Sequence, residues 1–233
     1  MGSKARFANE FLPLILKDRK PGQWFVEPFC GGCNVTDKVE NPRLANDINH
    51  YIIATWDALV YRGWIPKIYT KEEYDDIKAY KDMMYEDHVV GWAGINCSFK
   101  GIFFSGFAGE ITTKTGVKRD YRGEALRLTM KQVPKLVGVK FTSVPFNKLN
   151  LTVIPNSIIY CDPPYQGKSG YKREFDFDLY WNWIREMGNQ GHTIFCSEYQ
   201  APEDFECIWE KSANSRISGK NTESIERLFK RKV

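Results

Sequence analysis

The fold is decided by residues 24–33, which read Trp-Phe-Val-Glu-Pro-Phe-Cys-Gly-Gly-Cys. The first six form a short, mostly apolar run closed by Pro28 and a glycine pair, a pattern typical of a buried central strand that enters a loop. A second short strand, residues 43–46, ends at Asp47, and apolar residues between 52 and 60 then recur at helical spacing. A strand, a glycine loop, an acid and a helix in this order predict a doubly wound α/β fold.

The rest of the chain continues this alternation around one interruption. The expected helices are residues 7–15, 121–136 and 178–190, and the expected strands are 140–144, 157–161 and 193–197, with a C-terminal antiparallel hairpin near 216–218 and 225–229. From about residue 63 to residue 116 the periodicity weakens, and Lys114-Thr115-Gly116 indicates a turn between two strands. We therefore expect a Rossmann-like, mostly parallel sheet domain over 1–62 and 121–233, and an inserted lobe with a β-hairpin over 63–120.

Composition narrows the class of protein only slightly. The formal net charge of +4 over 233 residues suits a polyanionic partner and an ordinary soluble protein equally. The sequence has no apolar run near the roughly 18 to 20 residues that span a bilayer, and no signal-peptide pattern. Six cysteines without a secretion signal favour reduced thiols. We expect a cytoplasmic protein without a membrane span, as a monomer or a weak dimer.

The most informative motif is Asp162-Pro163-Pro164-Tyr165, directly after an apolar run. Open α/β sheets bind ligands at the carboxyl ends of their strands. The exocyclic amine of a base is a poor nucleophile because its lone pair is delocalised, and two acceptors on its hydrogens would free that pair. The Asp162 carboxylate and the Pro163 carbonyl are two acceptors on a turn that both prolines stiffen. Tyr165 offers a ring for stacking on a base swung out of a duplex. A plain turn that ends a strand is the structural alternative.

The glycine motif, Glu27-Pro28-Phe29-Cys30-Gly31-Gly32, suits a nucleoside cofactor. Glycine lets the backbone approach a ligand closely, in the loop where such cofactors lie. Asp47 follows about twenty residues later, where a carboxylate can accept hydrogen bonds from both ribose hydroxyls. Cys30 and Cys33 could also form a metal or redox pair. A structural zinc site needs four ligands, and the sequence has no second close pair, so we favour loop packing and expect no metal.

Together these motifs resemble the Dam-like DNA adenine methyltransferases of the D12 class, in the alpha group, whose glycine motif precedes Asp-Pro-Pro-Tyr. They are most similar to versions that bacteriophages and prophages encode. The resemblance covers nearly the whole chain, from Gly2-Ser3-Lys4 through both motifs and Asn46-Asp47-Ile48-Asn49 to Ser197-Glu198-Tyr199. It implies a site-specific enzyme in a bacterial cell that moves a methyl group from S-adenosylmethionine (SAM) to N6 of an adenine flipped out of double-stranded DNA.

The resemblance also implies roles for single residues. The implied catalytic residues are Asp162, Pro163, Pro164 and Tyr165, and the implied cofactor residues are Lys4, Glu27, Pro28, Phe29, Gly31, Gly32, Asp47, Ile48, Phe146 and Asp162. Lys4 could equally be a solvated terminal lysine, and Phe29 a core residue. Cys33 stands where the family usually has a second glycine, and the aromatic residue usual four positions before the lysine has no counterpart. Pro145 replaces an acid that often pairs with the cofactor's adenine, and Phe146 could substitute for it.

Residues 96–122 combine aromatic, glycine and basic residues, and in the family this region reads the target sequence, partly through a β-hairpin in the major groove. The predicted phosphate contacts are Lys100, Lys114, Lys118, Arg119 and Arg122, with Lys168, Lys172 and Arg173 after the catalytic turn. The structural alternative is a hairpin packed by its own aromatic residues, with solvated charges.

Three other functions stay open at this point. Methylation of the 4-amino group of cytosine needs a similar site, although Asp162 in place of a serine favours adenine. Methylation of a protein glutamine amide usually has asparagine at that position, and the basic, aromatic insert favours nucleic acid instead. A binding module that keeps the fold and occupies DNA without turnover is the third.

Overall fold

The computed structural model describes residues 4–113, 115–165, 175–217 and 220–232, with the backbone alone for 213–217 and 220–224. The chain forms two compact units. The sheet unit consists of Lys4–Asn46 and Val144–Val233, and the helical unit of Asp47–Ser143. Within the described ranges, every helix is too short or too polar to cross a membrane.

The sheet unit is built on six strands in the order β2-β1-β6-β7-β9-β8. They are β1 (Phe25–Glu27), β2 (Arg43–Asn46), β6 (Ile158–Cys161), β7 (Thr193–Glu198), β8 (Phe205–Ile217) and β9 (Lys220–Arg231). The pairs from β2 to β7 are parallel, whereas β9 pairs antiparallel with both β7 and β8. With β5 (Val139–Thr142) the sheet counts seven strands. The predicted doubly wound, mostly parallel sheet with a C-terminal antiparallel hairpin is confirmed.

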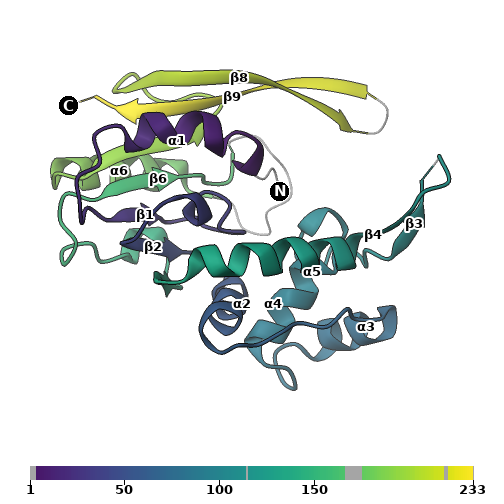
Figure 1. Cartoon of the computed structure of the whole chain (residues 1–233). Coiled ribbons are helices and arrows are strands. Elements are labelled where there is room, and N and C mark those ends of the chain that lie inside the picture. The colour runs from purple at the N-terminus through teal and green to yellow at the C-terminus, as the bar shows by residue number, and fades with distance from the viewer. Residues whose placement is uncertain (1–3, 114, 166–174, 218–219, 233) are drawn as a thin grey trace. The chain divides into compact units, whose positions relative to one another are not determined.

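Two helices, α1 (Ala8–Leu16) and α6 (Phe177–Asn189), cover opposite faces of these strands (Figure 1). Successive strand residues point to opposite faces. Tyr160 of β6 accordingly packs in the core cluster that contains Phe11 of α1, and its neighbour Ile159 packs in the cluster that contains Ile184 of α6. All four residues of β6 are buried. The turn that begins at Asp162 therefore follows a well-packed strand.

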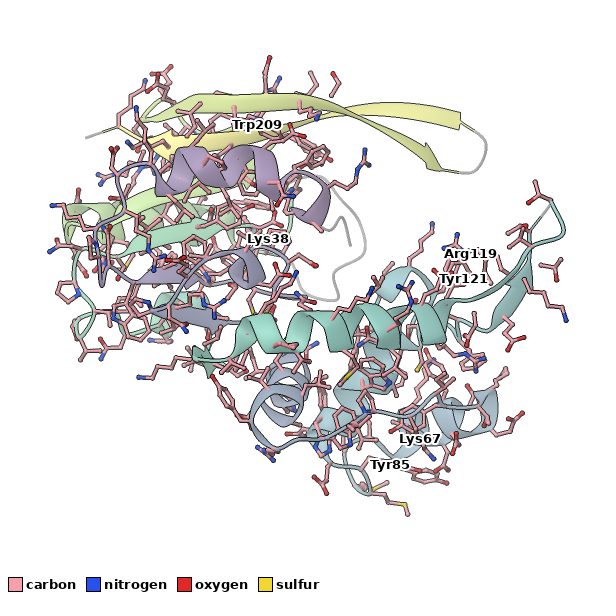
Figure 2. The ribbon with its side chains drawn as sticks, in the orientation of Figure 1. Lys38, Lys67, Tyr85, Arg119, Tyr121 and Trp209 are labelled. Atoms are coloured by element: carbon pink, nitrogen blue, oxygen red, sulfur yellow. The ribbon has the colours of Figure 1, made fainter. Side chains whose placement is uncertain are left out.

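The C-terminal hairpin is much longer than the sequence indicates. Its strands pair from Phe205 opposite Arg231 to Ile217 opposite Lys220, with one irregularity between Cys207 and Trp209. The ring of Trp209, labelled in Figure 2, lies with its centroid 5.7 Å from that of Phe7, just before α1. The sequence could not predict this length, because residues 218–226 are mostly polar and show no alternation.

Within its described residues, the helical unit contains four α-helices, two short 3-10 helices, a small β-hairpin and strand β5. Its α-helices and hairpin strands are α2 (His50–Tyr61), α3 (Lys71–Tyr80), α4 (Asp87–Asn96), α5 (Tyr121–Gln132), β3 (Glu110–Thr112) and β4 (Lys118–Asp120). The predicted turn at 114–116 joins β3 and β4, although Lys114 lies outside the described residues. The unit is larger than the lobe expected over 63–120, because α2 packs against α4. A Cβ at Gly91 would lie 2.1 Å from the carbonyl oxygen of Tyr51, so only glycine permits this approach.

The sequence pattern does not reveal helices α3 and α4. Helix α3 is largely polar, and its start is fixed by a capping box in which Thr70 and Glu73 exchange side-chain to backbone hydrogen bonds. Helix α4 has five consecutive buried residues, 90–94, two of them glycines. A helix that is buried all round shows no amphipathic period, and this explains the weak signal.

Candidate active site

The predicted catalytic turn begins immediately after β6. Pro163 is buried, and the side chain of Asp162 is 22% exposed. Burial raises the pKa of Asp162 to about 6, while the positive charge of Lys4 opposes this rise. The carboxyl group is therefore mostly ionised at neutral pH, and an ionised carboxylate is purely a hydrogen-bond acceptor.

Lys4 brings a positive charge to this turn from the short helix η1 (Lys4–Arg6), directly before α1. Its side chain is 9% exposed, and its Nζ lies 3.3 Å from Oδ1 of Asp162 and 2.7 Å from Oε2 of Glu226. It also donates to the hydroxyl of Tyr165. Burial lowers the pKa of Lys4, but the two carboxylates outweigh burial and raise the pKa overall. The resemblance assigned Lys4 to the cofactor, a role that stays a prediction. The structure places its ammonium against the Asp162 carboxylate.

Glu226 is a residue of this site that the sequence alone does not indicate. It lies on β9 and accepts a hydrogen bond from the Tyr165 hydroxyl at 3.0 Å as well as from Lys4. The ring of Tyr165 is further packed edge to face against Tyr199, with centroids 4.7 Å apart, and the Lys4 Nζ lies 4.4 Å from the Tyr165 centroid. A lone glutamate in a polar stretch carries no motif, so only the strand register could have revealed it.

The glycine loop holds a second buried carboxyl group. Glu27, at the end of β1, accepts hydrogen bonds from the backbone N–H of Thr36 at 3.0 Å and from the Thr36 hydroxyl. Burial raises the pKa of Glu27 to about 8, although both Thr36 hydrogen bonds oppose the rise. The buried Glu27 side chain thus links the start of the glycine loop to Thr36.

The backbone of this loop is left-handed at two positions. Gly31 has φ +44°, and among the described residues nothing lies within 4 Å of where its Cβ would stand. Cys33, at the place of the family's second glycine, has φ +52°, and its side chain is buried. The strained Cys33 conformation keeps the turn that a glycine would adopt freely, and open space at Gly31 is what close approach of a ligand requires.

The rings of Phe29, Phe146 and Phe175 pack together and form an aromatic wall at the glycine loop. Phe29 and Phe146 have ring centroids 5.5 Å apart, and Phe175 lies 5.8 Å from Phe29 and 5.7 Å from Phe146. Phe175 was not among the predicted residues. Such a wall fits one face of a purine, so the residues present fit a nucleoside cofactor.

Asn46 is the last residue of β2 and Asp47 follows it, and their side chains make different hydrogen bonds. In the sheet unit, the Asn46 amide donates to the carbonyls of Pro28 (3.0 Å) and Val144 (2.9 Å) and so ties two loops together. In the helical unit, Oδ1 of Asp47 accepts from the backbone N–H of Asn49 at 2.9 Å, and Ile48 is exposed. Asn46 belongs to the motif Asn46-Asp47-Ile48-Asn49, but the sequence indicates no role for it. The ribose contact of Asp47 stays a prediction.

The predicted DNA-contacting residues differ in how available they are. Arg119, at the foot of the β3–β4 hairpin in Figure 2, is 45% exposed and donates to both carboxylate oxygens of Glu124, at 3.0 and 2.7 Å. Lys118 and Lys100 are exposed. Arg122 is 13% exposed and donates to the carbonyl of Tyr69. Lys114, Lys168, Lys172 and Arg173 lie outside the described residues. All eight contacts stay predictions.

Among the described residues, there is no group of three or more His, Cys, Asp or Glu side chains that could hold a metal ion. Cys30 and Cys33 are both buried, and the backbone N–H of Cys33 donates to the carbonyl of Cys30 at 2.7 Å. Both residues pack within the loop.

Comparison with known families assigns the first part of the chain. Residues 1–91 match the family of D12 class N6 adenine-specific DNA methyltransferases. The match covers 91 of the 233 residues. Enzymes of this class are SAM-dependent and specific for adenine in DNA. The match includes Lys4 and the glycine motif but not the Asp162 turn, which the structure joins to Lys4 directly.

Three solved structures illustrate the similarity of fold. TrmN from Thermus thermophilus is 13% identical with a TM-score of 0.43, and the match covers 97% of this chain and 48% of that chain. The rRNA methyltransferase aviRa from Streptomyces viridochromogenes is 9% identical with a TM-score of 0.47, over 99% and 86%. SMU.472 in complex with SAH is 15% identical with a TM-score of 0.37, over 98% and 53%. The chain spans about half the length of TrmN, and these likenesses concern the fold alone.

Proposed function

We propose that this protein is a site-specific DNA methyltransferase that transfers the methyl group of SAM to N6 of an adenine flipped out of double-stranded DNA. The observation that carries the proposal is the Asp162 carboxylate at the carboxyl end of the buried strand β6, 3.3 Å from the Lys4 ammonium. The family match of residues 1–91 supports the choice of adenine and of DNA.

The catalytic turn supplies the acceptors that the reaction needs. Asp162 accepts one N6 hydrogen and the Pro163 carbonyl accepts the other, so that the nitrogen lone pair points at the methyl group. Bound SAM would supply a methyl group on a sulfonium, so that the N–C bond would form as the S–C bond breaks and the electron pair of the broken bond would stay on sulfur. The amine then loses one proton, which the Asp162 carboxylate can accept because burial raises its pKa to about 6.

The proposed cofactor site uses the glycine loop and the aromatic wall. Open space at Gly31 admits the methionine part, and Phe29 with Phe146 packs on the purine. Asp47, with Ile48 beside it, takes the ribose. The remaining implied residues, Glu27, Pro28 and Gly32, shape the loop.

The β3–β4 hairpin and its basic residues are proposed to contact DNA, as part of a target-recognition region over 63–120, inserted in a SAM-binding catalytic domain over 1–62 and 121–233. The phage or prophage type, the cytoplasmic location and a monomeric or weakly dimeric state belong to the same proposal. Sequencing DNA from cells that express the protein, with a readout for methylated bases, identifies the recognised site.

The test is transfer of labelled methyl groups from SAM to unmethylated duplex DNA, beside an Asp162→Ala variant. Digestion of the product to nucleosides should place the label on N6-methyladenine for the wild type alone. Equal label in both proteins would refute the role of Asp162, and label on cytosine would refute the substrate. Tight DNA binding without label would identify a binding module.

A further inference from the structure

We propose that Glu226 of the C-terminal hairpin is a positioning residue of the active site, which holds Lys4 and Tyr165 so that the Asp162 carboxylate stays available to the target amine. This inference rests on the proposed adenine methylation. It extends the site to a strand that no motif marks, about sixty residues after the catalytic turn.

Glu226 is the closer of the two carboxylates that share Lys4. Its Oε2 lies 2.7 Å from the Lys4 Nζ, whereas Oδ1 of Asp162 lies 3.3 Å from the same atom. The same Oε2 accepts the Tyr165 hydroxyl at 3.0 Å. The Glu226 side chain is 16% exposed, so these hydrogen bonds compete with little water.

Because Lys4 contacts both Glu226 and Asp162, it does not occupy all the lone pairs of the Asp162 carboxylate. An ammonium has three donors, and Lys4 directs them to Glu226, Tyr165 and Asp162. If Lys4 closed on Asp162, it would occupy lone pairs that the adenine N6 hydrogens need. Because the Lys4 ammonium lies closer to Glu226 than to Asp162, its positive charge stays near Asp162 while the carboxylate oxygens of Asp162 can still accept hydrogen bonds from the adenine N6.

The strand register explains why Glu226 reaches the site. On β9 the residues alternate between faces, and Leu228 belongs to the core cluster beneath α1. Glu226 shares this face, toward the N-terminal helix from which Lys4 comes. Arg227 points to the opposite face, where it pairs with Glu210 and donates to the Tyr199 carbonyl.

Anchoring the hydroxyl also fixes the ring of Tyr165. Its orientation is set by Glu226 at the oxygen and by Tyr199 at the ring, with centroids 4.7 Å apart. A base that stacks on Tyr165 then meets a ring in one orientation, which lowers the entropy cost of binding.

The electrostatic consequence can be measured at Asp162. The titratable groups that act on it are Lys4 from η1, Glu27 from β1, Tyr160 from β6, Tyr165 from the turn and Glu226 from β9. The negative charge of Glu226 raises the pKa of Asp162, and that of Lys4 lowers it. Glu226→Gln removes the negative charge that raises the pKa of Asp162, and it lets Lys4 move closer to Asp162. Both changes lower the pKa of Asp162.

The experiment compares Glu226→Gln with wild type and with Glu210→Gln, a control carboxylate on β8 that is 62% exposed and pairs with Arg227. For Glu226→Gln, kcat should fall about tenfold, the cost of one charge-assisted hydrogen bond, with the KM for DNA and the SAM affinity by calorimetry nearly unchanged. The acid limb of the kcat profile should move to lower pH. Glu226→Asp, which keeps the charge, should move that limb back toward wild type, and Glu210→Gln should match wild type throughout.

A double-variant cycle separates positioning from general support of the fold. In a Lys4→Met background, Glu226→Gln should cost little further activity, because the residue that it positions is gone. Wild-type kcat in Glu226→Gln overturns the proposal. The proposal is also overturned if Glu226→Gln lowers kcat tenfold without moving the acid limb of the kcat profile, and if the same tenfold loss occurs in the Lys4→Met background.

A carboxyl NMR titration of Asp162 without substrate, assigned with Asp162→Asn, distinguishes this inference from the proposed function. A lower pKa of Asp162 in Glu226→Gln supports the positioning role even if wild type methylates no DNA, which would refute the proposed function alone. An unchanged pKa in an active enzyme refutes the positioning role alone.

Discussion

The two carboxyl groups at the ends of neighbouring strands, Asp162 after β6 and Glu27 in β1, have opposite kinds of partner. Asp162 faces the Lys4 ammonium, while Glu27 accepts from the hydroxyl and backbone N–H of Thr36. Burial raises the pKa of both, to about 6 for Asp162 and to about 8 for Glu27.

The difference decides the charge of each group at pH 7. Asp162 is mostly ionised and can accept hydrogen bonds from an amine, whereas Glu27 is mostly protonated and neutral. A buried carboxyl group beside a cation stays ionised and suits a catalytic role, whereas one with neutral partners is protonated and suits a structural role. Variants that change either partner test this distinction.

The largest effect is expected for Asp162→Asn. The variant loses the ionised acceptor and leaves Lys4 facing a neutral amide, so kcat should fall about 10²- to 10³-fold, the usual effect of removing one precisely placed electrostatic group. Steady-state transfer of labelled methyl groups measures this loss. Circular dichroism should show a folded protein, and a folded variant within about threefold of wild type would contradict the role of Asp162.

Lys4→Gln should produce a pH-dependent loss. Without the Lys4 charge the pKa of Asp162 rises, so the acid limb of the kcat profile should move up by about one pH unit. Activity should fall more at pH 6.5 than at pH 8.5, because Asp162 is increasingly protonated below its raised pKa. The direction is opposite to that expected for Glu226→Gln.

Lys17→Gln, at the exposed end of α1, is the matched control for Lys4→Gln and should keep the wild-type profile. A uniform loss at all pH values in Lys4→Gln would mean that Lys4 acts on binding rather than on the charge of Asp162.

Glu27→Gln should change stability, with a sign set by the raised pKa. The folded state keeps the Glu27 proton up to about pH 8, whereas the unfolded chain releases it near the ordinary glutamate pKa. Wild type therefore loses stability as the pH rises between these values, by on the order of 4 kcal/mol in total. Glutamine, which does not ionise, escapes this loss.

Urea unfolding of both proteins from pH 5 to pH 9 measures the effect. The free energy of unfolding of Glu27→Gln relative to wild type should grow with pH and level off above about pH 8. A difference that is constant with pH would show that Glu27 is ionised in the folded protein.

The sequence predicted the part of the site that short motifs specify. Asp162 and the glycine loop follow buried strands, so a local apolar run and its turn residues were enough to place them. The resemblance to the Dam-like family added Lys4, which no local pattern singles out, as a cofactor residue. The structure places its ammonium beside Asp162 instead, and the cofactor contact stays a prediction.

The rest of the site depends on contacts between residues far apart in the chain. Glu226 reaches Lys4 across 222 positions through the register of β9, and Phe175 joins Phe29 only because α6 packs on the sheet. Phe175 lies outside the predicted elements, and Glu226 lies within the predicted strand 225–229 but belongs to no motif. The helices α3 and α4 escaped prediction for a related reason, because one is stabilised mainly by its cap and the other is buried on all sides.

The smallest effect is expected at the hairpin, for Arg119→Ala. Arg119 already pairs with Glu124 through two hydrogen bonds, so it must exchange this partner for a phosphate, and the net gain is small. DNA affinity should fall about three- to tenfold for every sequence, and the slope of log K against log salt should decrease by about one. Fluorescence anisotropy at several salt concentrations measures both.

Lys71→Ala is the matched control, because Lys71 on α3 is 62% exposed and also has an acidic partner, Asp75. It should leave the affinity and the salt slope unchanged. If both variants behave alike, the charge of Arg119 makes no phosphate contact and the hairpin prediction fails at this position. If Arg119→Ala weakens binding to the recognised site far more than to other sequences, Arg119 contacts a base edge, because a phosphate contact carries no sequence information.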